Sequence, residues 1–347
     1  MRTLQHFRDN PPESLSIVTA YALSDLAEAK GRQELYTRQS PQRLKNLREN
    51  ALIESAISSN RIEGVEVEHA RIGTLIHGAP ALRDREEAEV RGYKDALNLI
   101  HSEATALPIS EDTTLRLHSL CRGETWDAGQ YKERDIDIIE NYPDGRSRVR
   151  FSPVPASKTP PAMRELFALW GRGSRESWVP PLILVAAMNL DFLCIHPFRD
   201  GNGRVSRLML LQGLYHCGFE VGRYISVERL IEQEKERYYE TLELSSAGWH
   251  EGRHSPWPYI NFLLYVFNRA CKELEERVGR LTAPRGEKSA LVKAAIMRRT
   301  APFSVAELAQ DCPGVSVDTI RQVLKKLRGT TVECLGRGQQ ARWKRIN

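Results

Sequence analysis

The feature that most constrains the fold is a nearly continuous apolar segment at 180–195, "PPLILVAAMNLDFLCI", followed after a short polar stretch by a second apolar segment at 204–217. A helix that is apolar on nearly every face has to be enclosed by other elements, so we expect a buried helix over 181–195. The chain has 347 residues, of which 41% are hydrophobic and 27% charged, enough for two or three domains with a sizeable core.

The remaining periodicity is mostly helical. Apolar residues recur at helical spacing in several further segments. These segments are 15–58, 84–104, a short one after Ser110, which we expect to cap it, 160–170, 227–244 and 258–279. We therefore expect a mainly α fold.

One segment breaks this pattern. Ile136 and Ile138 alternate with charged residues, the turn-forming residues 143–145 follow, and the chain returns through Val149 and Phe151. Alternation on both sides of a Pro-Asp-Gly turn predicts a β-hairpin, placed at about 129–153.

The last 60 residues have their own pattern. After a linker-like "LTAPRGEK", a helix at 289–299 precedes a capping box formed by Ser304 and Glu307, and a third helix leads to two strands around a glycine-rich turn. Three short helices and a hairpin predict a winged helix-turn-helix over 285–347. DNA and protein both remain open as its partner. The basic residues that would face DNA phosphates are Arg321, Lys325, Lys326 and Arg328.

Charge separates the tail from the body. Residues 285–347 carry 13 Lys and Arg against 5 Asp and Glu, a net of +8, whereas the rest carries 37 against 40, a net of −3. Bulk charge therefore does not make the body a nucleic-acid binder. No apolar run approaches the roughly 20 residues of a membrane span, and "MRTLQHFRDNPPES" has no signal-like apolar core. Six scattered cysteines without a CxxC pair favour a reducing, cytoplasmic location.

The polar stretch between the two apolar segments, "HPFRDGNGRVSR", has the residue types of an anion site. Gly201 and Gly203 allow backbone N–H groups to converge at a helix N-terminus, where the helix dipole favours phosphate. Arg204 and Arg207 lie three residues apart, so both can reach one anion. Asp200 offers a hard oxygen for Mg²⁺ beside that anion.

His196 opens the same stretch, where its imidazole could take a proton from an incoming hydroxyl. Two other motif readings fail: an EF-hand needs Glu at the twelfth position from Asp200, which is Leu211, and "GNGRVS" lacks the third glycine and the preceding strand of a dinucleotide fingerprint. A purely structural turn would not explain the whole group of residues.

The run from His196 to Arg207 resembles the signature of the Fic family, HPF-x-[D/E]-G-N-G-R-x-x-R, at every defined position. "ERYYETLELSSAG", "SPWPYINFLL" and the hairpin also resemble parts of the Fic core, so the resemblance spans about 50–280. It implies a helical core with a flap, and transfer of a nucleotide monophosphate, usually AMP from Mg-ATP, to a protein hydroxyl.

The resemblance implies a role for each signature residue. His196 would be the general base and Asp200 would bind Mg²⁺. The backbone of Gly201, Asn202 and Gly203 would hold the α-phosphate. Arg204 would hold the β-phosphate and Arg207 the γ-phosphate.

Two further parts of the core acquire expected roles from the same resemblance. The flap strand, Ile136, Asp137, Ile138 and Ile139, would align the target segment by strand addition. Tyr238 and Tyr239 would line the nucleoside pocket. Ser246 stands where some relatives carry Asn, which leaves base selectivity open.

"ISSNRIEGVEV" resembles the inhibitory motif [S/T]-x-x-x-E-[G/N] of self-restrained Fic proteins through Ser59, Glu63 and Gly64. On an inhibitory helix at about 52–63, the Glu63 carboxylate could pair with Arg207 and take the place of the γ-phosphate. A helix cap with a terminal glycine is the alternative interpretation.

"HEGRH", His250 to His254, matches the HExxH motif of zinc peptidases, which needs both histidines on one helical face. Gly248, Gly252 and the following "SPWP" instead predict a loop with two exposed histidines. A zinc peptidase stays a second enzymatic alternative.

The sequence thus predicts an autoinhibited, self-modifying protein adenylyltransferase with an N-terminal helical region (1–105), a Fic core (106–280) with its catalytic loop at 196–207, and the winged helix. The expected partners are ATP with Mg²⁺ and a protein carrying a Ser, Thr or Tyr hydroxyl. A homodimer, transfer of UMP, phosphocholine or a phosphoryl group, AMP removal, and a nucleotide-sensing DNA-binding regulator remain open.

Overall fold

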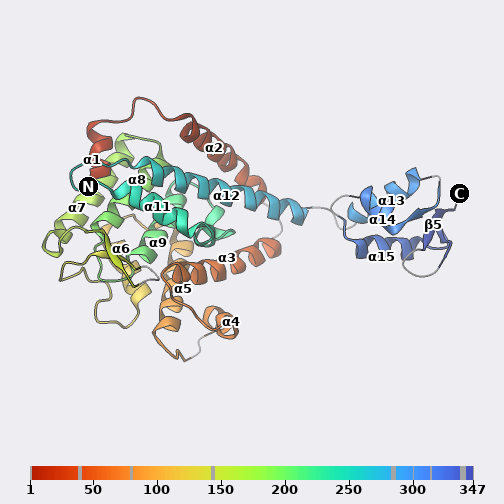
Figure 1. The fold of residues 1–347 in the computed structure, drawn as a ribbon, viewed down its shortest axis with the longest axis horizontal. Coiled ribbons are helices and arrows are strands. Elements are labelled where there is room, and N and C mark those ends of the chain that lie inside the picture. Colours follow the sequence, from red (N-terminus) through yellow and green to blue (C-terminus); the bar gives the residue numbers. More distant parts are fainter. Residues whose placement is uncertain are drawn as a thin grey trace. The chain divides into compact units, whose positions relative to one another are not determined.

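The computed structural model describes residues 2–37, 41–78, 81–141, 145–282, 287–299, 301–312, 315–336 and 341–346. The chain forms two compact units, Met1–Arg277 and Val278–Asn347 (Figure 1). Helices dominate the first unit, as the sequence predicts, and two small sheets complete the described secondary structure. Within the described part of the chain, no helix is both long enough and apolar enough to cross a bilayer.

The helical elements that begin in the first unit are α1 (Arg2–Asp9), α2 (Ile17–Thr37), α3 (Pro41–Ile62), α4 (His69–His77), α5 (Arg85–Glu103), η1 (Ala104–Ala106), α6 (Glu111–Arg122), η2 (Ala156–Lys158), α7 (Thr159–Glu176), α8 (Pro181–Ile195), α9 (Asn202–His216), η3 (Val221–Arg223), α10 (Val227–Gln233), α11 (Lys235–Ser246) and α12 (Trp257–Thr282). Neither α1 nor α4 was predicted from the sequence. The single helix expected over 227–244 instead divides at Glu234 into α10 and α11.

The buried helix predicted over 181–195 is confirmed as α8. It packs against α9, α7 and α1, and nearly all of its side chains are buried. Two polar side chains within α8 form hydrogen bonds with segments that are distant in the sequence. Asp191 accepts the Thr3 and Leu4 N–H groups at 3.0 Å each, so a buried carboxylate of α8 caps the N-terminus of α1. Asn189 donates to the Ser206 carbonyl of α9 at 2.8 Å.

A second group of helices supports α9 from the N-terminal part of the chain. α5 packs against α3, α6 and α9. Asp84 begins α5 by accepting the Glu87 N–H at 2.8 Å, and Ser110 begins α6 by accepting the Thr113 N–H at 3.2 Å, as the sequence predicted for Ser110. Helices α3 and α5 both contact α9, and α5 reaches its C-terminal end, where Tyr215 Oη lies 2.7 Å from His101 Nδ1.

The predicted hairpin forms the antiparallel pair β1 (Ile138–Asn141) and β2 (Ser147–Phe151), in which Glu140 faces Arg148. The expected strand 136–139 is therefore shifted: pairing begins at Ile138, with an irregularity before Ile139, and Ile136 and Asp137 precede it. The expected turn residues Pro143 and Asp144 lie outside the described residues.

The second unit contains α13 (Glu287–Arg298), β3 (Phe303–Ser304), α14 (Val305–Gln310), α15 (Val317–Leu327), β4 (Val332–Cys334) and β5 (Arg342–Arg345). The strands form an antiparallel sheet in the order β3-β5-β4, and β3 was not anticipated. The predicted capping box of Ser304 and Glu307 is confirmed. The residues of the expected glycine-rich turn at 337–340 lie outside the described residues.

Candidate active site

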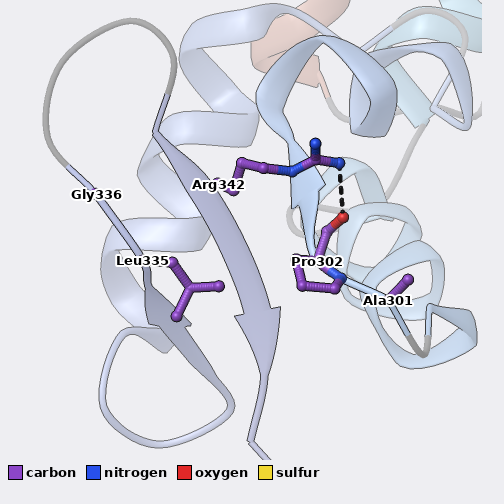
Figure 2. A pocket seen from close by; sticks show the side chains of 5 residues that line it. All are labelled: Ala301, Pro302, Leu335, Gly336 and Arg342. Carbon is purple, nitrogen blue, oxygen red and sulfur yellow. Dashed lines mark hydrogen bonds between the residues drawn. The ribbon is translucent and has the colours of Figure 1, made fainter.

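Two pockets differ in the chemistry of their lining. The pocket in Figure 2, about 520 Å³, is lined in the described residues by Ala301, Pro302, Leu335, Gly336 and Arg342, with Arg342 bound to the Pro302 carbonyl at 2.9 Å. None of these residues offers a proton acceptor or nucleophile. A pocket of about 940 Å³ in the first unit is lined by His196, Glu63, Gly203 and the hairpin, so it is the candidate active site.

The loop between α8 and α9 is shaped by its own backbone. His196 ends α8 in the left-handed conformation, at φ 50°, and its N–H binds the Phe192 carbonyl at 2.9 Å. A non-glycine residue in this conformation is strained, a condition that clusters at functional sites. Gly201, at φ 83°, then starts α9. Asn202 closes the loop, because its amide donates to the Phe198 carbonyl at 2.8 Å and accepts the Phe198 N–H at 2.9 Å.

A histidine outside the motif supports this loop from α6. The ring of His118 stacks on Phe198 with centroids 3.7 Å apart. Its Nδ1 accepts the Gly129 N–H at 3.0 Å, so its Nε2 carries the hydrogen and donates to the Asp200 carbonyl at 3.0 Å. Burial lowers the pKa of His118 to about 4, so the ring is neutral at pH 7. No spacing in the sequence signalled this contact.

His196 presents a neutral imidazole to the pocket. Burial lowers its pKa to about 4, and the Lys132 ammonium adds to this effect. The Nδ1 atom of His196 is buried and has no hydrogen-bond partner among the described residues. The nearby Leu193 carbonyl favours the protonated ring without forming a hydrogen bond to Nδ1. Nε2 is therefore the nitrogen available to a molecule in the pocket. A neutral ring with a free nitrogen can accept a proton.

Arg207 is fully buried and held by the end of α3. Its Nε donates to Ser59 Oγ and its Nη2 to the Ser59 carbonyl, both at 2.8 Å. Nη2 also lies 2.8 Å from Glu63 Oε1. Burial lowers the pKa of Arg207, but the Glu63 carboxylate together with Tyr238, Tyr93 and Tyr239 outweighs burial, so the net pKa is raised. The structure thus brings Ser59, Glu63 and Arg207 together.

The Glu63 carboxylate also covers the beginning of α9. A Cβ built on Gly203 would lie 2.1 Å from Glu63 Oε1, so the carboxylate rests directly against the glycine backbone. The missing side chain at Gly203 is what allows an anion to approach there. Arg207 Nη1 is buried and, within the described part of the chain, has no hydrogen-bond partner. A carboxylate therefore occupies a place suited to a larger anion.

Arg204 faces a different acid. Its Nη1 lies 2.9 Å from Glu89 Oε2 on α5 and 3.4 Å from Asn60 Oδ1 on α3. Its Nη2 lies 3.3 Å from Asp200 Oδ1. Arg204 is buried and, among the described residues, does not line the pocket.

Asp200 lies within a group of arginines. Its Oδ2 accepts from Arg85 at 2.5 Å and from Arg122 at 2.8 Å. Burial raises the pKa of Asp200, but Arg204, Arg122, the Gly201 N–H and Arg85 together outweigh burial, so the net pKa is lowered. The carboxylate is therefore ionised at neutral pH, as a cation ligand has to be.

The remaining pocket wall comes from the hairpin and α11. Tyr238 and Tyr239 both line the pocket, as do Ser246 and the segment 136–140. Tyr239 packs under the Arg150 guanidinium and donates to the Ile62 carbonyl at 3.3 Å. Tyr239 thus connects α11 with the end of α3 next to Glu63.

The segment "HEGRH" is a loop, as predicted, and its histidines separate. His250 binds the Ser152 carbonyl at 2.8 Å, whereas His254 binds Thr3 Oγ1 at 2.8 Å. The expectation that both are exposed is wrong for His254, which is half-buried because α1 packs beside it. Among the described residues no group of three His, Cys, Asp or Glu could hold a metal. These contacts do not support a zinc peptidase.

Several residues of this site carried no recognisable sequence signal. They are Asn60, Arg85, Glu89, His118, Arg122 and Lys132. The Arg85 and Glu89 pair, four residues apart, has the pattern of a solvent-facing helix, but Glu89 is buried where α5 packs against α9. Only the tertiary arrangement reveals that role.

Comparisons with known proteins agree with this geometry. Residues 108–214 match the model of the Fic/DOC family. The chain is 22% identical over 214 residues to a "Protein adenylyltransferase Fic" of Nematostella vectensis, a match that covers 59% of this chain and 46% of the relative. The chain therefore spans less than half the length of that curated relative.

Two solved structures share the fold. A Fic family protein from Desulfovibrio desulfuricans G20 aligns with a TM-score of 0.63 at 22% identity, covering 97% of this chain and 98% of that one. A Fic domain containing signaling protein from Bacteroides thetaiotaomicron VPI-5482 aligns with a TM-score of 0.62 at 19% identity, covering 74% and 97%. The segment that runs from α6 through the catalytic loop into α9 is a Fic/DOC family domain.

Proposed function

We propose that this chain is a protein adenylyltransferase that transfers AMP from ATP to a Ser, Thr or Tyr hydroxyl and is restrained by Glu63. One observation carries the proposal: the Glu63 carboxylate pairs with buried Arg207 and rests on Gly203, in the same pocket as a neutral His196. An anion thus already sits between an arginine and a helix N-terminus, beside a proton acceptor.

In the proposed reaction, Nε2 of His196 takes the proton of the target hydroxyl as its oxygen bonds to the α-phosphorus. The bond from that phosphorus to the α,β-bridging oxygen breaks, and pyrophosphate leaves. The backbone at the start of α9, from Gly201 to Gly203, is proposed to hold the α-phosphate; the N–H groups of Asn202 and Gly203 would face the charge that develops there, because the Gly201 N–H already donates to Asp200 Oδ1. Arg204 and Arg207 are proposed for the β- and γ-phosphates, and Tyr238 and Tyr239 for the nucleoside.

The residues present fit a magnesium ion held mainly by substrate. Mg²⁺ commonly binds one or two carboxylates together with phosphates and water, and Asp200 supplies one ionised carboxylate beside the start of α9. When bound, Mg²⁺ would neutralise phosphate charge. The Nη1 atom of Arg207 is buried and has no partner among the described residues, which supports the binding of a further anion beside Arg207.

Glu63 would inhibit transfer through the position of its carboxylate. Its carboxylate occupies the space next to Arg207 where a γ-phosphate would bind, so a nucleotide would enter without its α-phosphate aligned with His196. The hairpin would align the target chain: β1 pairs with β2 along one edge, and Ile139 is exposed.

Intact-mass spectrometry of the full chain with each Mg-nucleotide tests the function. We expect the Glu63→Gly variant to gain the mass of AMP with ATP, and His196→Ala in that background to lose about 10²- to 10⁴-fold in rate. Gain of a different mass would identify another transferred group, such as UMP, phosphocholine or phosphate. Loss of AMP from a modified target in wild type would support removal instead. Equal rates with and without His196, in folded protein, would reject it as the base.

A second candidate is a nucleotide-sensing regulator that binds DNA. It is favoured by the four basic residues at α15 that are exposed, Arg321, Lys325, Lys326 and Arg328. Retention of the full chain on DNA, falling steeply with salt and lost when these side chains are removed, would support it. Retention that does not depend on them would count against it.

A further inference from the structure

The Asp200 carboxylate has no acceptor position to spare. A carboxylate offers roughly four lone-pair positions on two oxygens. Oδ1 accepts from the Gly201 N–H at 2.6 Å and lies 3.3 Å from Arg204 Nη2. Oδ2 accepts from Arg122 at 2.8 Å and from Arg85 at 2.5 Å. A cation can bind this carboxylate only after one of the four donors leaves.

Three of these donors are fixed. The Gly201 N–H belongs to the backbone that starts α9. Arg122 is buried and bound to Glu89 at 3.0 Å and to Asp127 at 3.2 Å, while buried Arg204 is bound to Glu89 at 2.9 Å. Moving Arg122 would take the arginine partner from buried Asp127, and moving Arg204 would separate a buried guanidinium from Glu89; both changes are costly.

Arg85 is different. It lies at the first residue of α5, and its side chain is 61% exposed, against 6% for Arg122 and 2% for Arg204. Its Nε also binds Glu89 Oε1 at 2.8 Å. Nη2 can therefore leave Asp200 while the guanidinium keeps a partner and stays hydrated. Exposed pairs of this kind are weak enough to exchange.

We propose that Arg85 is a positioning residue that occupies the cation-binding side of Asp200 and has to swing away before Mg²⁺ binds. This inference rests on the proposed function, because it assumes a metal-nucleotide at Asp200. Arg85 sets how much metal is needed, and it does so at a place distinct from Glu63, which faces Arg207.

Binding of Mn²⁺, measured by electron paramagnetic resonance, tests the proposal without turnover. The probe is Mn²⁺ with α,β-methylene-ATP, whose α–β bond cannot be cleaved, added to the full chain in the Glu63→Gly background. Arg85→Ala should lower the apparent Kd for Mn²⁺ by about threefold to tenfold, since a weak exposed ion pair no longer competes. Arg85→Gln should act in the same direction.

Arg83→Ala is the matched control. Arg83 is 60% exposed and pairs with Glu68, so its removal deletes one charge two residues away without touching Asp200. It should leave the Kd within about twofold. In the Asp200→Asn background, Arg85→Ala should have no effect on Mn²⁺ binding.

Each contrary result has a separate meaning. An equal Kd for Arg85→Ala and its parent, or an equal gain from Arg83→Ala, would overturn the role of Arg85 and leave the proposed function intact. A gain that persists with Asp200→Asn would also overturn it. Absence of Mn²⁺-nucleotide binding in every variant would overturn the metal site itself, and the proposed function with it.

Discussion

Arg204 and Arg207 lie one turn apart on α9 and are both buried, yet they are held by different kinds of acid. Arg204 binds Glu89, whose side chain is 4% exposed within α5. Arg207 binds Glu63, whose side chain is 32% exposed and lies one residue beyond the end of α3. Gly64, at φ 82°, follows at once. Helix α9 thus carries one ion pair that is buried between helices, Arg204 with Glu89, and one at the edge of the pocket, Arg207 with Glu63.

This difference separates a structural pair from a replaceable one. Glu89 binds three arginines, Arg85, Arg122 and Arg204, so its loss would leave several buried charges unbalanced. Among the residues that the structure describes, Glu63 pairs with one arginine, and water or another anion could take the place of the Glu63 carboxylate. Three substitutions and one pH profile test this contrast, from the largest expected free-energy effect to the smallest.

Glu89→Ala should lower the free energy of unfolding by about 3–5 kcal/mol, because it leaves Arg204 and Arg122 buried without their shared counter-charge. Urea denaturation followed by circular dichroism measures this. Glu86→Ala, an exposed position in the same helix, is the control and should change stability by less than about 0.5 kcal/mol. Glu89→Gln keeps an acceptor oxygen and should lose less. If Glu89→Ala lowered the free energy of unfolding by less than about 1 kcal/mol, the ion pairs of Glu89 would contribute no more than ordinary surface ion pairs.

The pH profile of transfer tests the protonation state of His196, which lines the same pocket as Glu63. Because the pKa of His196 is lowered to about 4, the ring stays neutral and able to accept a proton well below pH 6.5. In the Glu63→Gly variant we expect the rate to hold down to about pH 5 and fall towards pH 4. A lowering from 6.5 to about 4 corresponds to about 3 kcal/mol. The Glu63 charge raises the pKa of His196, so removing it should not move the acid limb upward. An acid limb near 6.5 would contradict the buried, neutral ring.

The secondary structure was largely predictable because its signals are local. α8 has the predicted bounds, and the Ser110 and Ser304 caps form as expected. Errors arose where tertiary contacts decide the outcome. The helix expected over 227–244 is interrupted at Glu234, whose carboxylate is bound by Arg269 of α12 at 2.9 Å.

The residues of the candidate site also divide into those that the sequence could predict and those that only tertiary contacts define. Residues within the signature, and the "SNRIEG" segment, could be named from their order along the chain. Glu89, Arg85 and His118 could not, because what defines them is the packing of α5 and α6 against α9. A buried acid at helical spacing from an arginine looks identical, in sequence, to a solvent-exposed pair.

Glu63→Gly should raise self-labelling with α-labelled ATP by an order of magnitude or more, about 1.4 kcal/mol or above, because the place beside Arg207 becomes free for phosphate. Arg207→Ala in that background should remove most of the gain. Stability should fall by only about 1 kcal/mol, since water enters at the pocket rim. Glu66→Gly, three residues on, serves as the labelling control. If a folded Glu63→Gly variant labelled no faster than wild type and still needed His196, the end of α3 would have a structural role and no inhibitory one.

The smallest expected effect belongs to Gly203→Ala, which displaces Glu63 without emptying the site. The new Cβ would lie 2.1 Å from Glu63 Oε1 and 3.2 Å from Arg207 Nη1. Because the Glu63 side chain is flexible and partly exposed, it can move aside, and we expect a loss of about 1 kcal/mol or less in thermal denaturation. The methyl group then fills the space that an anion needs, so self-labelling should not rise as it does with Glu63→Gly. Gly73→Ala, at a position with open space around it, is the control and should not destabilise. If Gly203→Ala labelled as strongly as Glu63→Gly, the backbone at Gly203 would not be part of the phosphate site.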